Sequence, residues 1–235
     1  MSESEVSLIQ EGAGEDLVLL HGYLSCKESF YWQIKYFSKY FRVTAFDFWG
    51  FGKSPPLTEP WSVDDYAAHT LALLDELHIG RAHLLTHSFG GRVGLKLLAA
   101  HGERFLKAVF TGCAGIPPKR GISYRAKVFS YRAVRKIAPR YAEKHFGSAE
   151  YRTLSPVMRE SYKKIVNEDL TPCLKDVRNP VLFVFGQQDT ATPLYMGKIL
   201  SEGVRDGALV TMRGTHFCFS EDPDSFNRIA GEFLR

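Results

Sequence analysis

The stretch that decides the fold is LLTHSFGGRVG, residues 84–94. An apolar run followed by a serine and two glycines is typical of a buried strand that turns sharply into a helix. A nucleophilic serine at such a turn usually stands in the pattern G-x-S-x-G. Here Ser88 fits the pattern, but Thr86 replaces its first glycine. Thr86 is small, and Gly90 and Gly91 allow close packing on the helix side, so the pattern still indicates a nucleophile. The alternative is an ordinary polar residue at a strand–helix junction.

Other apolar runs of strand length occur on both sides of this stretch, at residues 16–21, 42–47, 107–112, 181–185 and 208–212. Helical patterns lie between them, at 63–77, 89–100 and 226–233. The first helix has Ser62 as a candidate N-cap, with Asp65 three residues later. Strands that alternate with helices predict an α/β fold with a mostly parallel sheet covered by helices on both faces.

One segment interrupts this alternation. Residues 116–176 contain no strand pattern but two amphipathic helical patterns, one over 124–137 and one after Pro156. We therefore expect a core made of residues 1–115 and 177–235, with 116–176 inserted as a helical lid. The insertion offers aromatic and apolar side chains as candidate walls of a substrate pocket, although each could equally belong to the core of the lid: Tyr124, Phe129, Tyr131, Phe146, Met158 and Tyr162.

The charge of the chain is unevenly distributed. The 235 residues carry a net charge of +4, whereas residues 116–176 hold 14 Lys and Arg against 6 Asp and Glu, a local charge of +8. The rest of the chain therefore carries −4. A basic lid could attract anionic substrates, or it could simply be a solvated helical face. The sequence shows no interleaving of basic and aromatic residues typical of nucleic-acid modules, so we expect no nucleic-acid partner.

The four cysteines lie far apart and form no C-x-x-C pair, which favours reduced thiols over a metal site or a disulfide framework. The N-terminus does not have the pattern of a signal peptide, and no uncharged apolar run approaches the roughly 18–20 residues that span a bilayer. We expect a cytoplasmic protein without a metal or organic cofactor. The oligomeric state is not readable from the sequence.

Several polar residues follow directly after the predicted strands. They are the HGY at 21–23, Ser88, Asp189 and His216. Ligands of open α/β sheets bind beyond the carboxyl ends of the strands, so these distant residues are expected to converge there. A serine hydroxyl needs a general base, and the base needs an acidic residue that orients it.

The base is sought among eight histidines. His87 precedes Ser88 in an extended segment and should point to the opposite face, where it supports the strand end. His21 belongs to the HGY turn, and the helical or inserted positions are His69, His78 and His145. Among the others, His216 lies on a loop after the last predicted strand and is expected to be the base, with Asp189 as its partner, although Asp189 could instead be a turn-forming residue. The backbone N–H groups of Tyr23 and Phe89 are the expected donors to an oxyanion, unless the HGY is only a tight turn.

Taken in chain order, five segments resemble the α/β-hydrolase fold family, in its small, lidded, single-domain type. They are LLHGYLSCKESF, FDFWGFGKSPP, LLTHSFGGRVG, FGQQDTATPL and GTHFCFSEDPDSF. The segment FGSAEYRTLSPVMRESYKKIVNEDLTP is similar to bacterial members described as hydrolases. The resemblance implies Ser88 as nucleophile, His216 as base and Asp189 as orienting acid. Two departures are Thr86 and a short N-terminus, which leaves the number of strands open.

The expected function is a serine hydrolase that cleaves small to medium carboxylic esters through an acyl-enzyme. Two alternatives remain open. One is the same triad used for carbon–carbon bond hydrolysis, or for a proton-abstracting lyase of the menaquinone-synthesis type, whose SFGGR stretch the chain resembles. In that lyase reading Arg92 would bind a carboxylate, although we expect it to pack or pair on its helix. The other is a non-catalytic protein that keeps the fold to bind a ligand.

Overall fold

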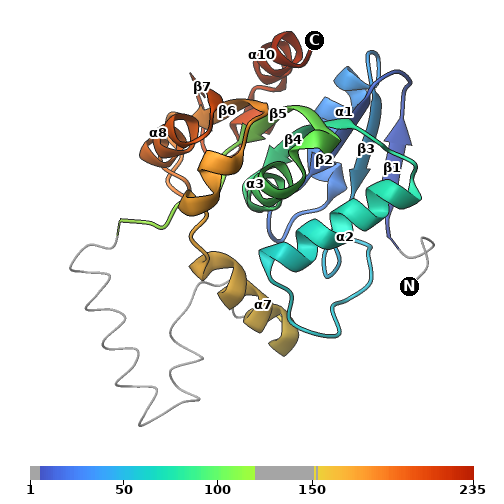
Figure 1. Cartoon of the computed structure of the whole chain (residues 1–235), viewed down its shortest axis with the longest axis vertical. Helices are drawn as coiled ribbons and strands as arrows, with labels where there is room; N and C mark the ends of the chain where they lie inside the picture. Colours follow the sequence, from blue (N-terminus) through green and yellow to red (C-terminus); the bar gives the residue numbers. More distant parts are fainter. Residues whose placement is uncertain (1–5, 120–150, 152) are drawn as a thin grey trace.

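A seven-stranded sheet forms the centre of the protein (Figure 1), in the order β1-β3-β2-β4-β5-β6-β7. The computed structural model describes residues 6–119, 151 and 153–235. β1 runs antiparallel to β3, and every other neighbouring pair is parallel. The predicted fold class is therefore confirmed. The strands are β1 (Leu8–Glu11), β2 (Asp16–Leu20), β3 (Arg42–Phe46), β4 (Ala82–His87), β5 (Phe105–Thr111), β6 (Pro180–Gly186) and β7 (Asp206–Met212).

Both faces of the central strands are buried. In β2, Val18 and Leu20 pack into one apolar cluster, while Leu17 and Leu19 pack into another on the opposite face. Successive side chains of a strand point to opposite faces, so a strand covered on both sides must be apolar at every position. This explains why the parallel strands are continuous apolar runs in the sequence.

Helices cover the two faces in two groups. The cluster that contains Val18 and Leu20 is completed by α2, α3 and α8, and the other cluster by α1, α9 and α10. α7 lies apart from the sheet, at the lower edge of Figure 1. The helices are η2 (Lys27–Phe30), α1 (Tyr31–Phe37), α2 (Val63–Glu76), α3 (Phe89–His101), η3 (Gly102–Arg104), α7 (Pro156–Asn167), η4 (Thr171–Asp176), α8 (Leu194–Gly203), α9 (Cys218–Glu221) and α10 (Pro223–Leu234).

Two predicted helix starts are confirmed. Ser62 and Asp65 form a reciprocal capping box at the start of α2, each side chain accepting from the other's backbone N–H. α7 begins at Pro156, where the missing N–H costs nothing, and the Ser155 side chain accepts from the Met158 N–H. None of the helices in the described ranges is long and apolar enough to cross a membrane.

Some elements were not predicted, and some predictions lie outside the described residues. β1, α1 and α8 have no counterpart in the sequence analysis. The helical pattern over 124–137 lies outside the described part of the chain, as do four of the candidate pocket residues, Tyr124, Phe129, Tyr131 and Phe146. Within the predicted insertion, Leu170 and Leu174 are buried in the cluster that α3 also helps to form.

Candidate active site

Ser88 occupies a strained turn between β4 and α3. Its backbone has φ 51° and ψ −107°, a conformation that a residue other than glycine rarely adopts. Three backbone hydrogen bonds hold the turn. The Ser88 N–H donates to the Thr111 carbonyl at 3.0 Å, and the Ser88 carbonyl accepts from Gly91 at 3.0 Å and Ala114 at 3.2 Å. Such strain persists where the surrounding structure fixes it, and it projects the hydroxyl away from the sheet.

Close packing of α3 explains how Thr86 is tolerated. A Cβ atom on Gly90 would collide with the backbone carbonyl of Leu20, so α3 lies directly against the sheet. The Thr86 methyl group faces Gly94, where a Cβ would stand only 3.2 Å from it. The space that the usual glycine provides on the strand is therefore provided here by a glycine on the helix. The Thr86 hydroxyl is buried and has no hydrogen-bond partner in the described part of the chain.

Asp189 and His216 form a hydrogen-bonded pair. The distance from His216 Nδ1 to Asp189 Oδ2 is 2.8 Å, with the carboxylate fully buried and the imidazole 15% exposed. Because a carboxylate accepts, Nδ1 carries the proton and Nε2 is left with its lone pair. Burial would raise the pKa of Asp189, but the hydrogen bonds from His216 and from the Thr192 N–H lower it below its usual value.

Thr192 supports this pair and was not predicted from the sequence. Its hydroxyl lies 2.8 Å from Asp189 Oδ2, 3.1 Å from the Gly112 carbonyl and 3.2 Å from His216 Nδ1. The only signal is the spacing D-x-x-T, since an aspartate often accepts hydrogen bonds from backbone N–H groups two or three residues later. Asp189 Oδ1 accepts from the N–H groups of Ala191 and Thr192, both at 2.8 Å.

The loop that carries His216 is fixed at its backbone. Glu221 accepts from the Thr215 N–H at 2.7 Å and also from the Thr215 hydroxyl. His87 Nε2 lies 3.0 Å from the His216 carbonyl, and the two imidazole rings are 4.8 Å apart between centroids. Gly112, with φ 52°, lies against the His216 ring, because a Cβ there would be 3.0 Å from Nδ1. The imidazole is thus held from several sides.

The HGY turn lies beside the Ser88 elbow. His21 Nδ1 donates to the Gly22 carbonyl at 2.7 Å, and His21 Nε2 accepts from the Phe48 N–H at 3.0 Å, so this histidine is neutral. Burial lowers the pKa of His21 to about 4. A Cβ on Gly22 would lie 3.6 Å from the Ser88 Cβ, which places the turn against the serine. His21 therefore shapes the loop, as expected.

Two backbone donors remain available at this turn. Among the described residues, neither the Tyr23 N–H nor the Phe89 N–H donates a hydrogen bond in the turns and loops around Ser88. Their rings are in contact, with centroids 5.6 Å apart. Phe89 is the first residue of α3, whose N-terminal amides and dipole favour negative charge. Two free amides next to a serine are suited to stabilise a developing oxyanion.

α7 closes over the same turn. The Tyr23 hydroxyl donates to the Met158 carbonyl at 3.2 Å, and the Tyr23 and Tyr162 rings are 5.2 Å apart. Of the predicted pocket residues, Met158 and Tyr162 are therefore placed near the HGY turn. Burial raises the pKa of Tyr23, which keeps its hydroxyl protonated as a donor.

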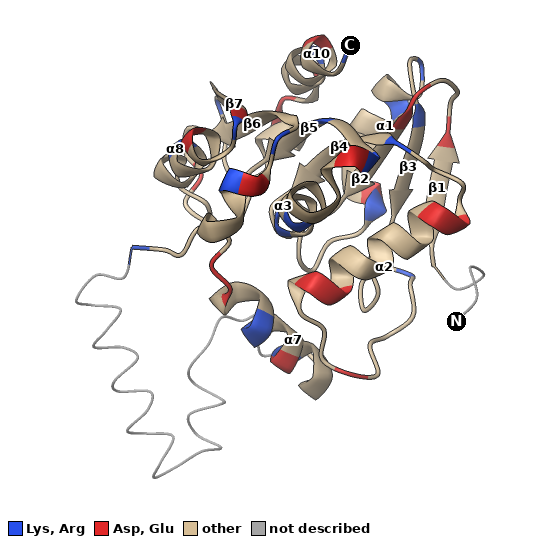
Figure 2. Ribbon diagram, viewed as in Figure 1, with Lys and Arg blue, Asp and Glu red and all other residues tan. Residues whose placement is uncertain are grey.

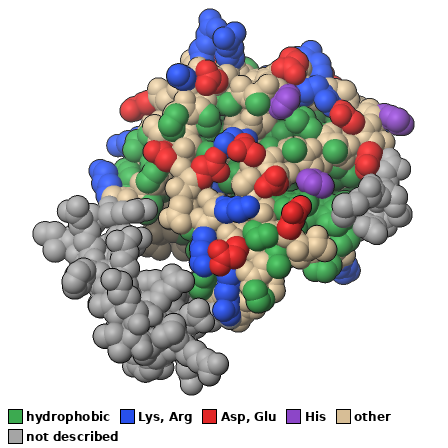
Figure 3. Space-filling view, turned by 60° about the horizontal axis from the view of Figure 1, so that its bottom comes forward, with side chains coloured by type: hydrophobic (Ala, Val, Ile, Leu, Met, Phe, Trp, Pro, Cys, Tyr) green, Lys and Arg blue, Asp and Glu red, His purple; other side chains and the backbone are tan. Residues whose placement is uncertain are grey.

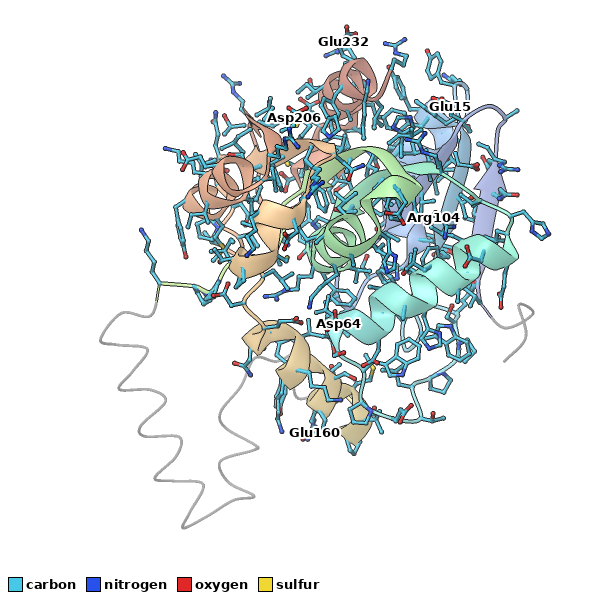
Figure 4. All side chains as sticks on the ribbon, in the orientation of Figure 1. Glu15, Asp64, Arg104, Glu160, Asp206 and Glu232 are labelled. Carbon is cyan, nitrogen blue, oxygen red and sulfur yellow. The ribbon has the colours of Figure 1, made fainter. Side chains whose placement is uncertain are left out.

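The other end of α7 is tied to α3. Arg92, which is buried, donates from Nη1 to the Glu168 carbonyl at 3.0 Å. Lys96, one turn later, lies 2.6 Å from the Glu168 carboxylate and 2.9 Å from the carboxylate of Asp64 at the start of α2, a residue labelled in Figure 4. Cations near the last carbonyls of a helix are favourable. The expectation that Arg92 packs or pairs between helices agrees with this contact.

The basic charge of the predicted insertion is confined to one part of it. Residues 153–176 hold four Lys and Arg and four Asp and Glu, so the whole +8 comes from residues 116–152. Accordingly α7 carries both signs in Figure 2, and acidic and basic side chains are interspersed on the face shown in Figure 3.

One cluster of possible metal ligands follows the HGY turn in the sequence. In the described ranges, Cys26, Glu28 and Asp47 bring three ligand atoms within 4.8 Å of one another. The Lys27 ammonium lies 2.9 Å from Asp47 and 3.1 Å from Glu28. The Lys27 ammonium thus already neutralises these two carboxylates, and the cluster is explained by its ion pairs.

Comparison with known proteins identifies the family. Residues 17–229 match the alpha/beta hydrolase family. The chain belongs to this family. The resemblance seen in the sequence is thereby confirmed, and with it the prediction of an α/β-hydrolase enzyme.

Relatives of this α/β hydrolase have several activities in their names. It is 28% identical over 211 residues to 3-oxoadipate enol-lactonase 2 of Acinetobacter baylyi, which covers 83% of this chain and 79% of the relative. It is 26% identical over 265 residues to 2-hydroxy-6-oxo-6-phenylhexa-2,4-dienoate hydrolase of Comamonas testosteroni, covering 100% of this chain and 93% of the relative.

Solved structures show the same fold. The enol-lactonase of Burkholderia xenovorans superposes with a TM-score of 0.77 at 22% identity, covering 97% of this chain and 96% of that one. An esterase of Exiguobacterium antarcticum superposes with a TM-score of 0.78 at 19% identity, covering 97% and 95%.

Proposed function

We propose that this α/β hydrolase is a serine esterase, which cleaves carboxylic esters of small to medium size through an acyl-enzyme. The observation that carries the proposal is the hydrogen-bonded Asp189–His216 pair, which leaves His216 Nε2 able to accept a proton. The loop of His216 contacts His87, which directly precedes the strained Ser88. A nucleophile on a sharp turn and an oriented imidazole on a neighbouring loop are what acyl transfer requires.

The reaction proceeds in two halves. The Ser88 oxygen attacks the ester carbonyl carbon while His216 Nε2 accepts the hydroxyl proton, and Asp189 stabilises the imidazolium without taking that proton. The Tyr23 and Phe89 N–H groups bind the oxyanion of the tetrahedral intermediate, each donor contributing roughly 3–4 kcal/mol. His216 then protonates the leaving alcohol. Water, deprotonated by His216, releases the acid and restores Ser88.

We assign residues 116–176 to a lid over this site. The described part that supports the assignment is α7, which contacts the HGY turn through Met158 and Tyr162. The Tyr162 ring and the Met158 side chain, which also lies against Gly50, are the proposed walls for the acyl or alcohol group. An uncharged wall with an aromatic ring favours apolar esters over highly polar ones.

One observation favours carbon–carbon bond hydrolysis as a second candidate: the name of the Comamonas testosteroni relative is that of such a hydrolase, and that relative matches the whole chain. For the lyase alternative, Arg92 would bind a substrate carboxylate, but its guanidinium is hydrogen-bonded to the Glu168 carbonyl at the end of α7. The esterase is the first candidate, and carbon–carbon bond hydrolysis is the second.

A panel of nitrophenyl esters of increasing chain length tests the proposal, with wild type and Ser88→Ala measured side by side. We expect turnover by wild type, a loss of most activity in Ser88→Ala, and labelling of Ser88 by a fluorophosphonate in the folded protein only. Faster turnover of a vinylogous diketone than of every ester would favour the second candidate. Stoichiometric binding of esters without turnover by wild type would instead point to a ligand-binding protein.

A further inference from the structure

His87 touches both loops that flank Ser88. Its side chain is almost completely buried, at 2% exposure, between the rings of His216, Phe217 and Phe219, with centroid distances of 4.7–5.3 Å. On its other side, a Cβ on Gly22 would lie 2.8 Å from His87 Nδ1.

The hydrogen bond to His216 fixes the proton of His87. A carbonyl oxygen only accepts, so the 3.0 Å contact with the His216 carbonyl requires a proton on Nε2. Nδ1, which faces Gly22, is then unprotonated. Burial and the neighbouring His216 lower the pKa of His87 to about 3, so this ring adds no positive charge beside the His216 imidazolium during the reaction.

We propose that His87 is a positioning residue for the proposed reaction. Its imidazole donates to the His216 carbonyl and separates the loop of His216 from the HGY turn. The proposal rests on the triad of the proposed function. His87 donates to the His216 backbone and packs against the His216 ring, and its effect passes through the placement of His216 relative to Ser88. A displacement of about 1 Å can cost on the order of 100-fold in rate.

Two substitutions separate positioning from mere support of the core. His87→Gln keeps a donor with similar reach, whereas His87→Leu fills a comparable volume but cannot donate. We expect His87→Gln to keep kcat within about 3-fold of wild type, and His87→Leu to lose roughly 100-fold in kcat. KM should change little in both, because the substrate walls on α7 are untouched. Fluorophosphonate labelling of Ser88 should slow in parallel with kcat.

Thermal unfolding of both variants supplies the control. The proposal is overturned if His87→Leu keeps wild-type kcat, or if kcat falls equally in both variants together with the unfolding temperature. The result for Ser88→Ala is read separately. If that variant loses its activity while His87→Leu does not, the esterase assignment stands and only the role of His87 fails.

Discussion

Asp189 holds His216 with one carboxylate oxygen and its own turn with the other. Oδ2 accepts from His216 Nδ1, while Oδ1 accepts from two backbone N–H groups at 2.8 Å. The contacts of Asp189 are therefore compatible with both interpretations of this residue from the sequence, an orienting acid and a turn-forming aspartate. The arrangement allows the two jobs to be separated by mutation.

Asp189→Asn should keep the turn and lose the reaction. The amide oxygen can still accept from the Ala191 and Thr192 N–H groups, but the amide nitrogen would donate to His216 Nδ1 and move the imidazole proton to Nε2. That tautomer cannot accept the serine proton, so kcat should fall by roughly 10⁴-fold. The unfolding temperature should stay near that of wild type, whereas Asp189→Ala should lower it. Activity within 10-fold of wild type in Asp189→Asn would contradict this role.

The strained turn at Ser88 predicts that glycine at this position gives a more stable protein than alanine does. Ser88 adopts φ 51°, which costs about 1–3 kcal/mol for a residue with a Cβ. Glycine relieves that strain, and its more flexible unfolded state offsets only about 0.4–1 kcal/mol. Ser88→Gly should therefore have a higher free energy of unfolding than Ser88→Ala by about 1 kcal/mol. Urea denaturation of the two inactive variants measures this, and equal stabilities would show that the turn is not strained.

Among the described residues the buried Thr86 hydroxyl has no hydrogen-bond partner, so replacement of Thr86 by an apolar residue should stabilise the protein. A buried polar group without a partner costs about 1–3 kcal/mol, and valine has nearly the same shape as threonine. Thr86→Val should raise the free energy of unfolding by about 1 kcal/mol. Thr70→Val is the matched control, since Thr70 is equally buried but its hydroxyl donates to the Tyr66 carbonyl at 2.8 Å. A gain in the control as large as that in Thr86→Val would contradict the explanation.

Asp47 should make the stability fall in acid. Burial would raise its pKa, but N–H donors from Lys53 and Lys27 and the Lys27 ammonium hold that pKa below its usual value. Such a carboxylate stabilises the fold fully above its unfolded pKa of about 3.9, and the contribution is lost as the pH falls through the lower folded value.

Asp47→Asn isolates that contribution. At neutral pH it leaves the buried Lys27 ammonium with the exposed Glu28 carboxylate as its remaining ionic partner, which should cost less than the roughly 3–5 kcal/mol of a fully unpaired buried charge. The difference in free energy of unfolding between wild type and Asp47→Asn should shrink as the pH falls from about 5 to about 2. Denaturation at several pH values measures it. A difference that is constant with pH would mean that Asp47 is not charged in the folded protein.

Tyr23→Phe should loosen α7 without removing an oxyanion donor. The substitution deletes only the hydroxyl bond to Met158, worth about 0.5–1.5 kcal/mol, and keeps the backbone N–H. Hydrogen exchange of the α7 amides should accelerate, while kcat for a short ester stays within about 3-fold, well below the roughly 100-fold cost of a lost oxyanion donor. Tyr66→Phe is the control, because the Tyr66 hydroxyl makes the same kind of bond, to the Trp49 carbonyl at 3.2 Å. Faster exchange in both variants would show a general loss of stability.

Most of the sheet could be predicted because its central parallel strands, β2 to β6, are buried on both faces, which leaves continuous apolar runs in the sequence. β1 was missed because Leu8–Glu11 is a half-exposed edge strand with no such run. α8 was missed because glycines at 197 and 203 interrupt its pattern. Gly197 is needed where the helix packs against the Phe185 ring, a contact that only the fold reveals.

The candidate site was predictable to the extent that strand ends converge. That rule selected Ser88 together with Asp189 and His216, which both lie more than a hundred residues after it. It gave no indication of Thr192, whose contacts depend on how the loop after β6 closes. His87 was expected to support the strand end, but its bond to the His216 backbone depends on the distance between two loops, which no local pattern encodes.

The contacts of Arg92 and Lys96 with Glu168 have a consequence for redesign. Both cations belong to α3, which begins directly after Ser88, so the C-terminal end of α7 is anchored to the helix that follows the proposed nucleophile. A chimaera that exchanges α7 should therefore retain Glu168, because a replacement there would remove the Lys96 ion pair.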